Sequence, residues 1–197
     1  KVLDPTYEGD FVLPEHLALD CGRTLANPTL HYAVYGRLNA ARDNAVLVCH
    51  ALTGSALVGS WWPEIFAPGA VLSLEQDFVI CINMLGSCYG STGPGSVNPE
   101  TGEAYGPDFP LISIRDNVRA QAQLLVEMLA NRPADHLPLH GQRLRVSPGG
   151  AGREVVCTAG HNEFHLPGAL SGAQFADPAI PIQRAPGRFL AVFAVVP

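Results

Sequence analysis

The sequence has no run of 18 or more apolar residues among its 197. A transmembrane helix needs about that length of apolar chain, so we expect no membrane span. The first residues do not place a basic segment before an apolar one, and we predict no secretory signal. Basic residues are also scarce, with 12 Lys and Arg against 18 Asp and Glu. The net charge of −6 argues against nucleic acid or an acidic membrane surface as a partner.

Cysteine is present in a number that does not fit a disulfide framework. There are five cysteines, and Cys49, Cys81 and Cys157 lie within apolar runs. An odd number of cysteines in apolar segments is typical of reduced, buried thiols. We therefore expect a cytoplasmic protein. The hydrophobic fraction of 47% is enough for one domain with a sizeable core.

Acidic residues become few toward the end of the chain. Residues 1–130 contain fourteen Asp and Glu against six Lys and Arg, whereas residues 131–197 contain four against six. The last 67 residues also include eight prolines, which interrupt regular secondary structure. The sequence therefore predicts two parts: a folded region over 1–130 and a largely irregular tail over 131–197.

Two short apolar runs organise the first part. Ala45–Cys49 and Phe78–Ile82 are apolar at every position and rich in Val and Ile, which predicts strands that are buried on both faces of a parallel sheet. Each run leads into a loop of small and polar residues. Because ligands bind at the carboxyl ends of such strands, we expect the functional site in these two loops.

The flanking segments complete an α/β pattern. Leu30–Gly36 alternates and predicts a strand, paired antiparallel with the preceding Phe11–Leu19 region at the edge of the sheet. Ser113 is a candidate N-cap, with Asp116 three residues later, for an amphipathic helix that continues to Leu129. The order of strands, loops and helix predicts an α/β fold with a mostly parallel sheet.

Several motifs between residues 10 and 130 occur together in the order of one protein family. They are His50-Ala51-Leu52-Thr53-Gly54, Trp61-Trp62, Asn83-Met84-Leu85-Gly86-Ser87-Cys88-Tyr89-Gly90-Ser91-Thr92-Gly93-Pro94, Tyr105-Gly106-Pro107-Asp108-Phe109-Pro110 and Ile114-Arg115-Asp116. This part of the chain resembles the homoserine O-acetyltransferases. These are acyltransferases of methionine biosynthesis with an α/β-hydrolase fold.

The resemblance implies a reaction and its participants. Acetyl-CoA acylates a serine, and L-homoserine then takes the acetyl group on its side-chain hydroxyl, with no bound cofactor or metal. The serine belongs to a Ser-His-Asp triad and lies in a Gly-x-Ser-x-Gly turn. The backbone N–H of Leu52 falls at the family's oxyanion donor position. The residues expected to shape the substrate pocket are Thr53, Gly54, Ser55, Gly86, Ser87, Cys88 and Tyr89.

The sequence departs from this family in its last third. Gly-x-Ser-x-Gly occurs nowhere in the chain, and residues 131–197 show no recognisable family motif. The chain is therefore predicted to be a truncated or frame-shifted, inactive form of the enzyme. The alternative is a non-catalytic binding module that uses the preserved pocket loops. If the tail does not supply the next strand, the sheet is incomplete, and its open edge favours marginal stability, self-association or a homodimer.

Three further groups are open to a chemical interpretation. Gly86-Ser87-Cys88-Tyr89-Gly90 could carry a cysteine nucleophile, although a loop that shapes the pocket is the favoured interpretation. His50 could act as a base, or serve only as part of its loop. Cys157, His161 and His165 have a spacing that could hold zinc on a helix, but Gly160 and Asn162 disfavour a helix there. The adjacent tryptophans, Trp61 and Trp62, could wall a pocket or pack a loop onto the sheet, and packing is the favoured interpretation.

Overall fold

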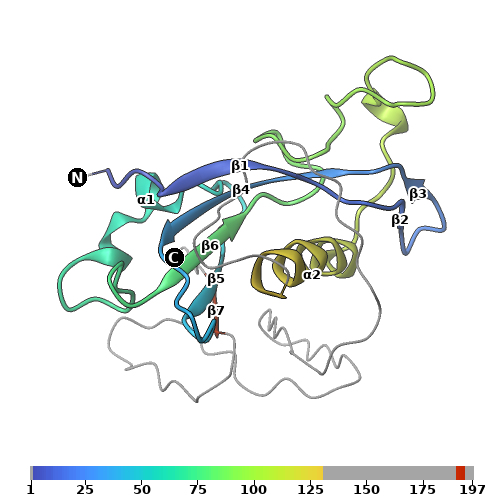
Figure 1. The fold of residues 1–197 in the computed structure, drawn as a ribbon. Coiled ribbons are helices and arrows are strands. Elements are labelled where there is room, and N and C mark those ends of the chain that lie inside the picture. Colours follow the sequence, from blue (N-terminus) through green and yellow to red (C-terminus); the bar gives the residue numbers. More distant parts are fainter. Residues whose placement is uncertain (1, 131–189, 194–197) are drawn as a thin grey trace.

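The computed structural model describes residues 2–130 and 190–193 (Figure 1). The strands are β1 (Tyr7–Val12), β2 (Leu17–Ala18), β3 (Thr24–Leu25), β4 (Thr29–Gly36), β5 (Ala45–Cys49), β6 (Phe78–Ile82) and β7 (Leu190–Phe193). The helices are α1 (Val58–Trp61) and α2 (Ile114–Ala130), and two short 3-10 helices are η1 (Pro63–Phe66) and η2 (Gly106–Asp108).

A five-stranded mixed sheet forms the centre of the described region, with strand order β1-β4-β6-β5-β7. β1 pairs antiparallel with β4, and β4 pairs antiparallel with β6. β5 runs parallel to both β6 and β7. The α/β class and the antiparallel pair at the edge of the sheet are thus confirmed. The Leu17–Ala18 segment does not join this sheet, because it pairs with Thr24–Leu25 in a separate ribbon.

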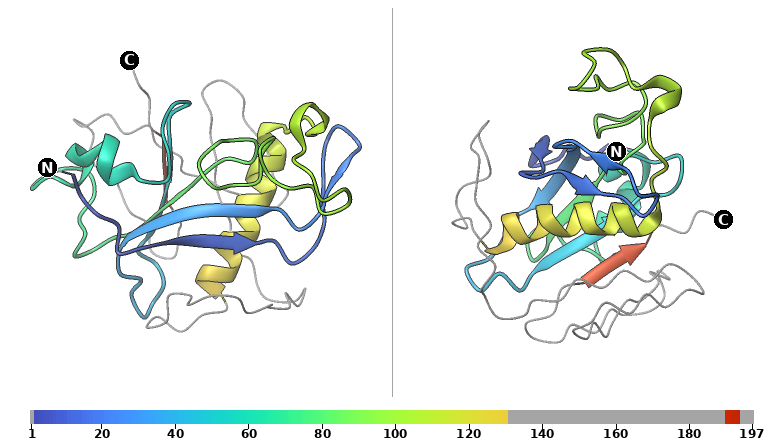
Figure 2. Two further views of the ribbon diagram at one scale, coloured as in Figure 1. Left: turned by 90° about the horizontal axis from the view of Figure 1, so that it is seen from above. Right: turned by 90° about the vertical axis from the view of Figure 1, so that its right-hand side faces the viewer.

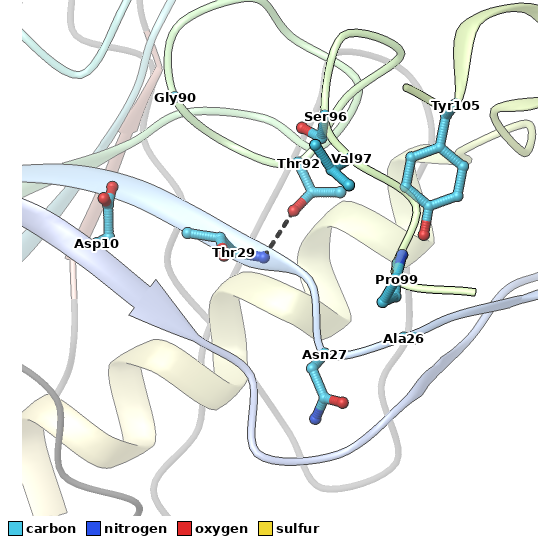
Figure 3. Close-up of a pocket in the computed structure, with 10 residues that line it drawn as sticks. All are labelled: Asp10, Ala26, Asn27, Thr29, Gly90, Thr92, Ser96, Val97, Pro99 and Tyr105. Carbon is cyan, nitrogen blue, oxygen red and sulfur yellow. Dashed lines mark hydrogen bonds between the residues drawn. The ribbon is translucent and has the colours of Figure 1, made fainter. Parts of the chain in front are cut away.

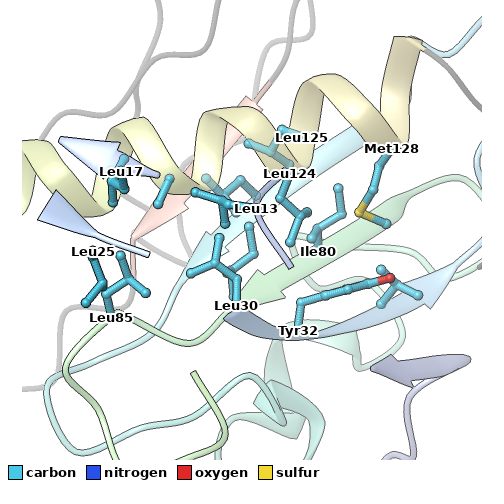
Figure 4. Packing of buried hydrophobic residues seen from close by; sticks show 14 of the residues in the cluster. Leu13, Leu17, Leu25, Leu30, Tyr32, Ile80, Leu85, Leu124, Leu125 and Met128 are labelled. Carbon is cyan, nitrogen blue, oxygen red and sulfur yellow. The ribbon is translucent and has the colours of Figure 1, made fainter. Parts of the chain in front are cut away.

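The sheet has an apolar core on each face, as the two uninterrupted apolar runs predicted. Successive residues along β6 alternate between the two cores: Ile80 belongs to one, and Val79 and Cys81 to the other. The first core packs against α2, where Leu124, Leu125 and Met128 meet side chains from the sheet and from the β2–β3 ribbon (Figure 4). The second core is closed by the segment that contains α1 and η1.

Strand β7 lies beside β5 and gives it a second parallel neighbour (Figure 2). The register pairs Val46 with Leu190 and Cys49 with Phe193. The chain after residue 130 therefore does supply a strand beside β5, so the condition under which we expected an open edge is not met here. Cys157, His161 and His165, which were considered as zinc ligands, lie outside the described residues.

Candidate functional site

The two loops expected to carry the site lie at the same edge of the sheet. Because β5 and β6 are parallel, His50–Leu57 (the first loop) and Asn83–Gly93 (the second loop) both begin at the carboxyl end of a strand. β4 runs in the opposite direction, so its first residues also reach this edge. There the Asn83 N–H donates a hydrogen bond of 2.8 Å to the His31 carbonyl oxygen.

The first loop is a tight turn with an exposed tip. Gly54 N–H donates to the Ala51 carbonyl oxygen at 2.8 Å, which places Leu52 and Thr53 at the two central positions. The Leu52 side chain is 99% exposed. The Leu52 side chain is therefore not part of either apolar core, and its N–H is not used to close the turn.

His50 is held by the loop that it begins. Its Nδ1 lies 2.8 Å from the Ala51 carbonyl oxygen. Since a carbonyl oxygen can only accept, Nδ1 is the donor in this contact. Nε2 is buried and has no hydrogen-bond partner among the described residues. The interpretation of His50 as a part of its loop agrees with this Nδ1 contact.

The second loop is shaped by close backbone approaches that exclude side chains. Gly86 N–H donates to the Thr92 carbonyl oxygen at 2.8 Å, with φ of +86° at Gly86. A Cβ atom on Gly93 would lie 2.5 Å from the Ser87 carbonyl oxygen, so only glycine fits there. Cys88 in this loop is exposed. The hydroxyl of Ser87 is buried and has no hydrogen-bond partner within the described part of the chain.

Asn83 joins the two loops. Its side chain is buried, with a residue exposure of 1%, directly after the last residue of β6. Its amide oxygen accepts a hydrogen bond from the Ala56 N–H at 2.6 Å, and its amide nitrogen donates to the Tyr89 carbonyl oxygen. The Asn83 carbonyl oxygen also accepts from the Ser91 hydroxyl at 2.8 Å. Sequence reasoning did not single out Asn83, although an amide directly after a fully apolar strand was the available signal.

The other end of the first loop is held by α1 and β6. The Ser55 carbonyl oxygen accepts from the Trp61 indole Nε1–H at 2.9 Å, and the Cys81 thiol lies 3.7 Å from the same oxygen. Burial raises the pKa of Cys81 to about 12, so this thiol stays protonated. Trp61 and Trp62 stack with ring centroids 6.0 Å apart and pack against the second core. The packing interpretation of the tryptophan pair is thus confirmed, and Trp61 adds a hydrogen bond to the loop.

Helix α2 supports the second loop through a side-chain hydrogen bond. The side-chain oxygen of Asn117 accepts from the Leu85 N–H at 2.7 Å. At the start of the helix, Asp116 N–H donates to the Ser113 hydroxyl at 3.1 Å, and Ser113 N–H donates to the Asp116 carboxylate at 2.8 Å. The predicted capping arrangement is therefore confirmed. It fixes the first turn of the helix from which Asn117 reaches the loop.

A cavity that the sequence did not reveal lies beside the second loop, with a volume of about 440 Å³ (Figure 3). It is bounded by β1, the start of β4 and the segment that follows the second loop. Thr92 at its wall accepts a hydrogen bond of 2.8 Å from the Thr29 N–H. Its lining residues are Asp10, Ala26, Asn27, Thr29, Gly90, Thr92, Ser96, Val97, Pro99 and Tyr105.

Residues 2–130 and 190–193 contain no group of three His, Cys, Asp or Glu side chains arranged to hold a metal ion. The same residues include no helix that is long and apolar enough to cross a membrane.

The sheet order and the loops at its carboxyl edge define the class of protein: the described residues form part of an α/β-hydrolase fold. Two solved structures have this fold in common with the chain. One is the homoserine O-acetyltransferase from Bacillus anthracis, with a TM-score of 0.58 and 30% identity over 64% of this chain and 38% of that one. The other is an esterase, with a TM-score of 0.56 and 30% identity over 62% of this chain and 37% of that one.

Curated relatives narrow the similarity further. The homoserine O-acetyltransferase of Geobacter sulfurreducens is 55% identical over 119 residues, which are 55% of this chain and 32% of the relative. The homoserine O-succinyltransferase of Alkalilimnicola ehrlichii is 48% identical over 120 residues, covering 56% of this chain and 31% of the relative. No family model matches the chain. The resemblance to homoserine O-acetyltransferases is thus confirmed as a partial match, and the chain spans about a third of the length of these relatives.

Proposed function

We propose that residues 1–130 are the N-terminal part of an acyltransferase of the homoserine O-acetyltransferase type. The supporting observation is the joining of the two loops at the carboxyl edge through Asn83, in a chain 55% identical to such an enzyme over 119 residues. In this proposal acetyl-CoA is the acyl donor and L-homoserine the acceptor, in methionine biosynthesis.

The first loop supplies the electrostatic part of the chemistry. The Leu52 N–H lies at a turn position that the closing hydrogen bond of the turn leaves unused. We propose that it donates to the oxyanion that develops on the acetyl carbonyl oxygen. A single donor of this kind typically contributes about 10²- to 10³-fold in rate. Thr53, Gly54 and Ser55 then wall one side of the substrate pocket, and Gly86, Ser87, Cys88 and Tyr89 wall the other.

We further propose that residues 1–197 alone do not transfer acetyl groups. Acyl transfer needs a nucleophile that attacks the thioester, releases the CoA thiol and passes the acetyl group to the homoserine hydroxyl. The sequence has no Gly-x-Ser-x-Gly turn to supply that nucleophile. The test measures release of the CoA thiol from acetyl-CoA by the purified chain, with and without L-homoserine. We expect no homoserine-dependent release, and a robust one would refute the proposal.

A binding module is the second candidate, because the chain has both pocket loops without the nucleophile turn. It predicts saturable binding of acetyl-CoA or L-homoserine without turnover. Isothermal titration calorimetry with each ligand tests it, and the absence of heat for both would remove this candidate. Ser87→Ala removes one hydroxyl from the proposed pocket but keeps the backbone hydrogen bonds of the second loop. It is therefore a matched variant to titrate beside the wild type.

The change in sequence character after residue 130 supports a further proposal, that the chain is a truncated or frame-shifted form of the enzyme and is intact only to about residue 130. The test is to sequence the encoding DNA through codon 130 and to translate all three frames. Another frame should encode a strand, then Gly-x-Ser-x-Gly, then a helix. If no frame does so, this tail is a genuine alternative ending.

The compartment is also a proposal. Cys21, Cys81 and Cys88 are free thiols, as expected in a reducing environment. Together with acetyl-CoA as the proposed donor, they support a cytoplasmic location. Fractionation of cells that express the chain from its own gene, with a cytoplasmic marker as the reference, tests this location.

A further inference from the structure

We propose that Asn83 is the positioning residue of the site, because it fixes the first loop against the second through one buried side chain. Its importance for catalysis rests on the function proposed above, in which the first loop presents the Leu52 N–H to substrate. The coupling of the two loops rests only on the contacts of Asn83. The two statements can therefore fail separately.

The tip of the first loop has little of its own to hold it. Leu52 is 99% exposed, so burial of its side chain does not anchor the turn. The position of the turn depends instead on its two ends. One end continues from β5. At the other end the Ser55 carbonyl oxygen accepts from Trp61, and the Ala56 N–H donates to Asn83 at 2.6 Å. Releasing Ala56 would therefore loosen the end of the turn that lies beyond Leu52.

Asn83 itself is fixed on several sides. Its backbone N–H donates to His31 on β4, and its backbone carbonyl oxygen accepts from Ser91 in the second loop. Its side chain is consequently presented from a rigid backbone. A movement of the second loop is carried to Ala56 through the amide group, and a movement of Ala56 is carried to Tyr89 in the same way.

The hydrogen-bonding groups on either side of Asn83 require an amide side chain at this position. Ala56 offers a donor and Tyr89 offers an acceptor, so the side chain between them must accept at one atom and donate at another. Asparagine does both. An ionised aspartate would accept from Ala56 but face the Tyr89 carbonyl oxygen with a second acceptor. Leucine has a similar volume and would satisfy neither group.

Asn117 provides the matched control. It is also a buried asparagine, and its side-chain oxygen accepts from the Leu85 N–H at 2.7 Å. Its other side-chain hydrogen bond, at 3.4 Å, goes to the carbonyl oxygen of Ser113, the residue directly before its own helix. It thus supports the second loop and makes no side-chain hydrogen bond to the first loop within the described part of the chain. Asn117→Ala should loosen only the second loop.

Hydrogen–deuterium exchange on the full chain tests the proposal. It is followed for peptides that cover 50–61 and 84–93, at pH about 8, where a carboxyl is ionised. Asn83→Leu should speed exchange in both peptides about tenfold, since buried groups lose their partners. Asn83→Asp should speed it in 84–93 and leave 50–61 near the wild-type rate, as should Asn117→Ala. This split between the loops is a readout that a general loss of stability would not produce.

Two results would overturn the proposal. One is wild-type exchange of 50–61 in Asn83→Leu. The other is faster exchange of 50–61 in Asn83→Asp, to the same extent as in Asn83→Leu. If the leucine variant does not fold, exchange of 50–61 in Asn83→Asp that is clearly faster than in the wild type still overturns the proposal. The exchange measurement contains no acyl donor. Coupled loops without any binding of acetyl-CoA or L-homoserine would therefore remove the binding-module candidate and leave the structural role of Asn83 intact.

Discussion

Ser113 and Asp116 each donate a backbone hydrogen bond to the side chain of the other, at 2.8 Å from Ser113 and 3.1 Å from Asp116. The Asp116 carboxylate is fully buried and also accepts from the Asp20 N–H at 3.1 Å and from the Arg119 guanidinium. One carboxylate therefore caps α2 and ties it to the turn after β2. Since α2 carries Asn117 beneath the second loop, this arrangement also supports the candidate site.

Asp116→Ala should destabilise the fold by about 2–3 kcal/mol, because it removes the cap and leaves buried donors without a partner. Asp116→Asn should cost less, since its amide oxygen still accepts from one donor. Urea unfolding followed by circular dichroism measures both. Glu103→Ala, at an exposed position, is the control and should stay within about 0.5 kcal/mol of the wild type. An Asp116→Ala variant as stable as Glu103→Ala would contradict the prediction.

The same carboxylate makes stability depend on acid. Burial alone would raise the pKa of Asp116, but hydrogen bonds from Ser113, Asp20 and Arg119 outweigh it and hold the pKa below the ordinary 3.8. The pKa of Asp20 is lowered as well, first by the Ser113 hydroxyl and then by Arg119. As the pH falls, the unfolded chain binds protons before the folded one. The stabilisation is complete above the ordinary value and is lost as the pH falls from about 4 through the lower folded pKa.

Urea unfolding of the wild type and Asp116→Asn from about pH 7 to about pH 3 checks this dependence. The gap in unfolding free energy between the two proteins should be widest near neutral pH and should narrow in acid. A gap that stays constant over the whole range would show that the charge of Asp116 contributes nothing to the difference.

The sequence was most informative where local chemistry and apolar patterning decide the structure. The runs at β5 and β6 are apolar at every position, and this identified strands buried on both faces. Ser113 and Asp116 identified the start of α2. The short β2–β3 ribbon was missed, because two-residue strands leave no periodicity to recognise.

The candidate site was predictable only in part. The positions of the loops follow from parallel strands that end at one edge. The bond between Asn83 and Ala56 does not, because 27 residues separate the partners and nothing local specifies that contact. The pairing of β7 with β5 could not be predicted either, because a terminal apolar run does not indicate which edge of the sheet it joins.

Cys81 should resist alkylation in the folded protein. Burial raises its pKa from 9.0 to about 12, and alkylating agents react with the thiolate. Cys21 and Cys88 are exposed and should react with iodoacetamide at about pH 8, whereas Cys81 should react only after unfolding in denaturant. Mass spectrometry of chymotryptic peptides measures all three in one sample, because Met84 and Leu85 lie between Cys81 and Cys88. Modification of native Cys81 at the rate of Cys88 would contradict the buried position of the thiol beneath Ser55.

Removal of β7 should make the protein self-associate. Without residues 190–197, the outer edge of β5 would expose the backbone donors and acceptors that now pair with β7 along Val46–Cys49. Such an open edge is a template for pairing with another chain. Sedimentation velocity should then show a mass that rises with concentration. A deletion of residues 194–197 alone retains the four residues of β7 and should sediment like the full chain. If both deletions sediment alike, β7 does not protect this edge, and the protein's association state depends on another surface.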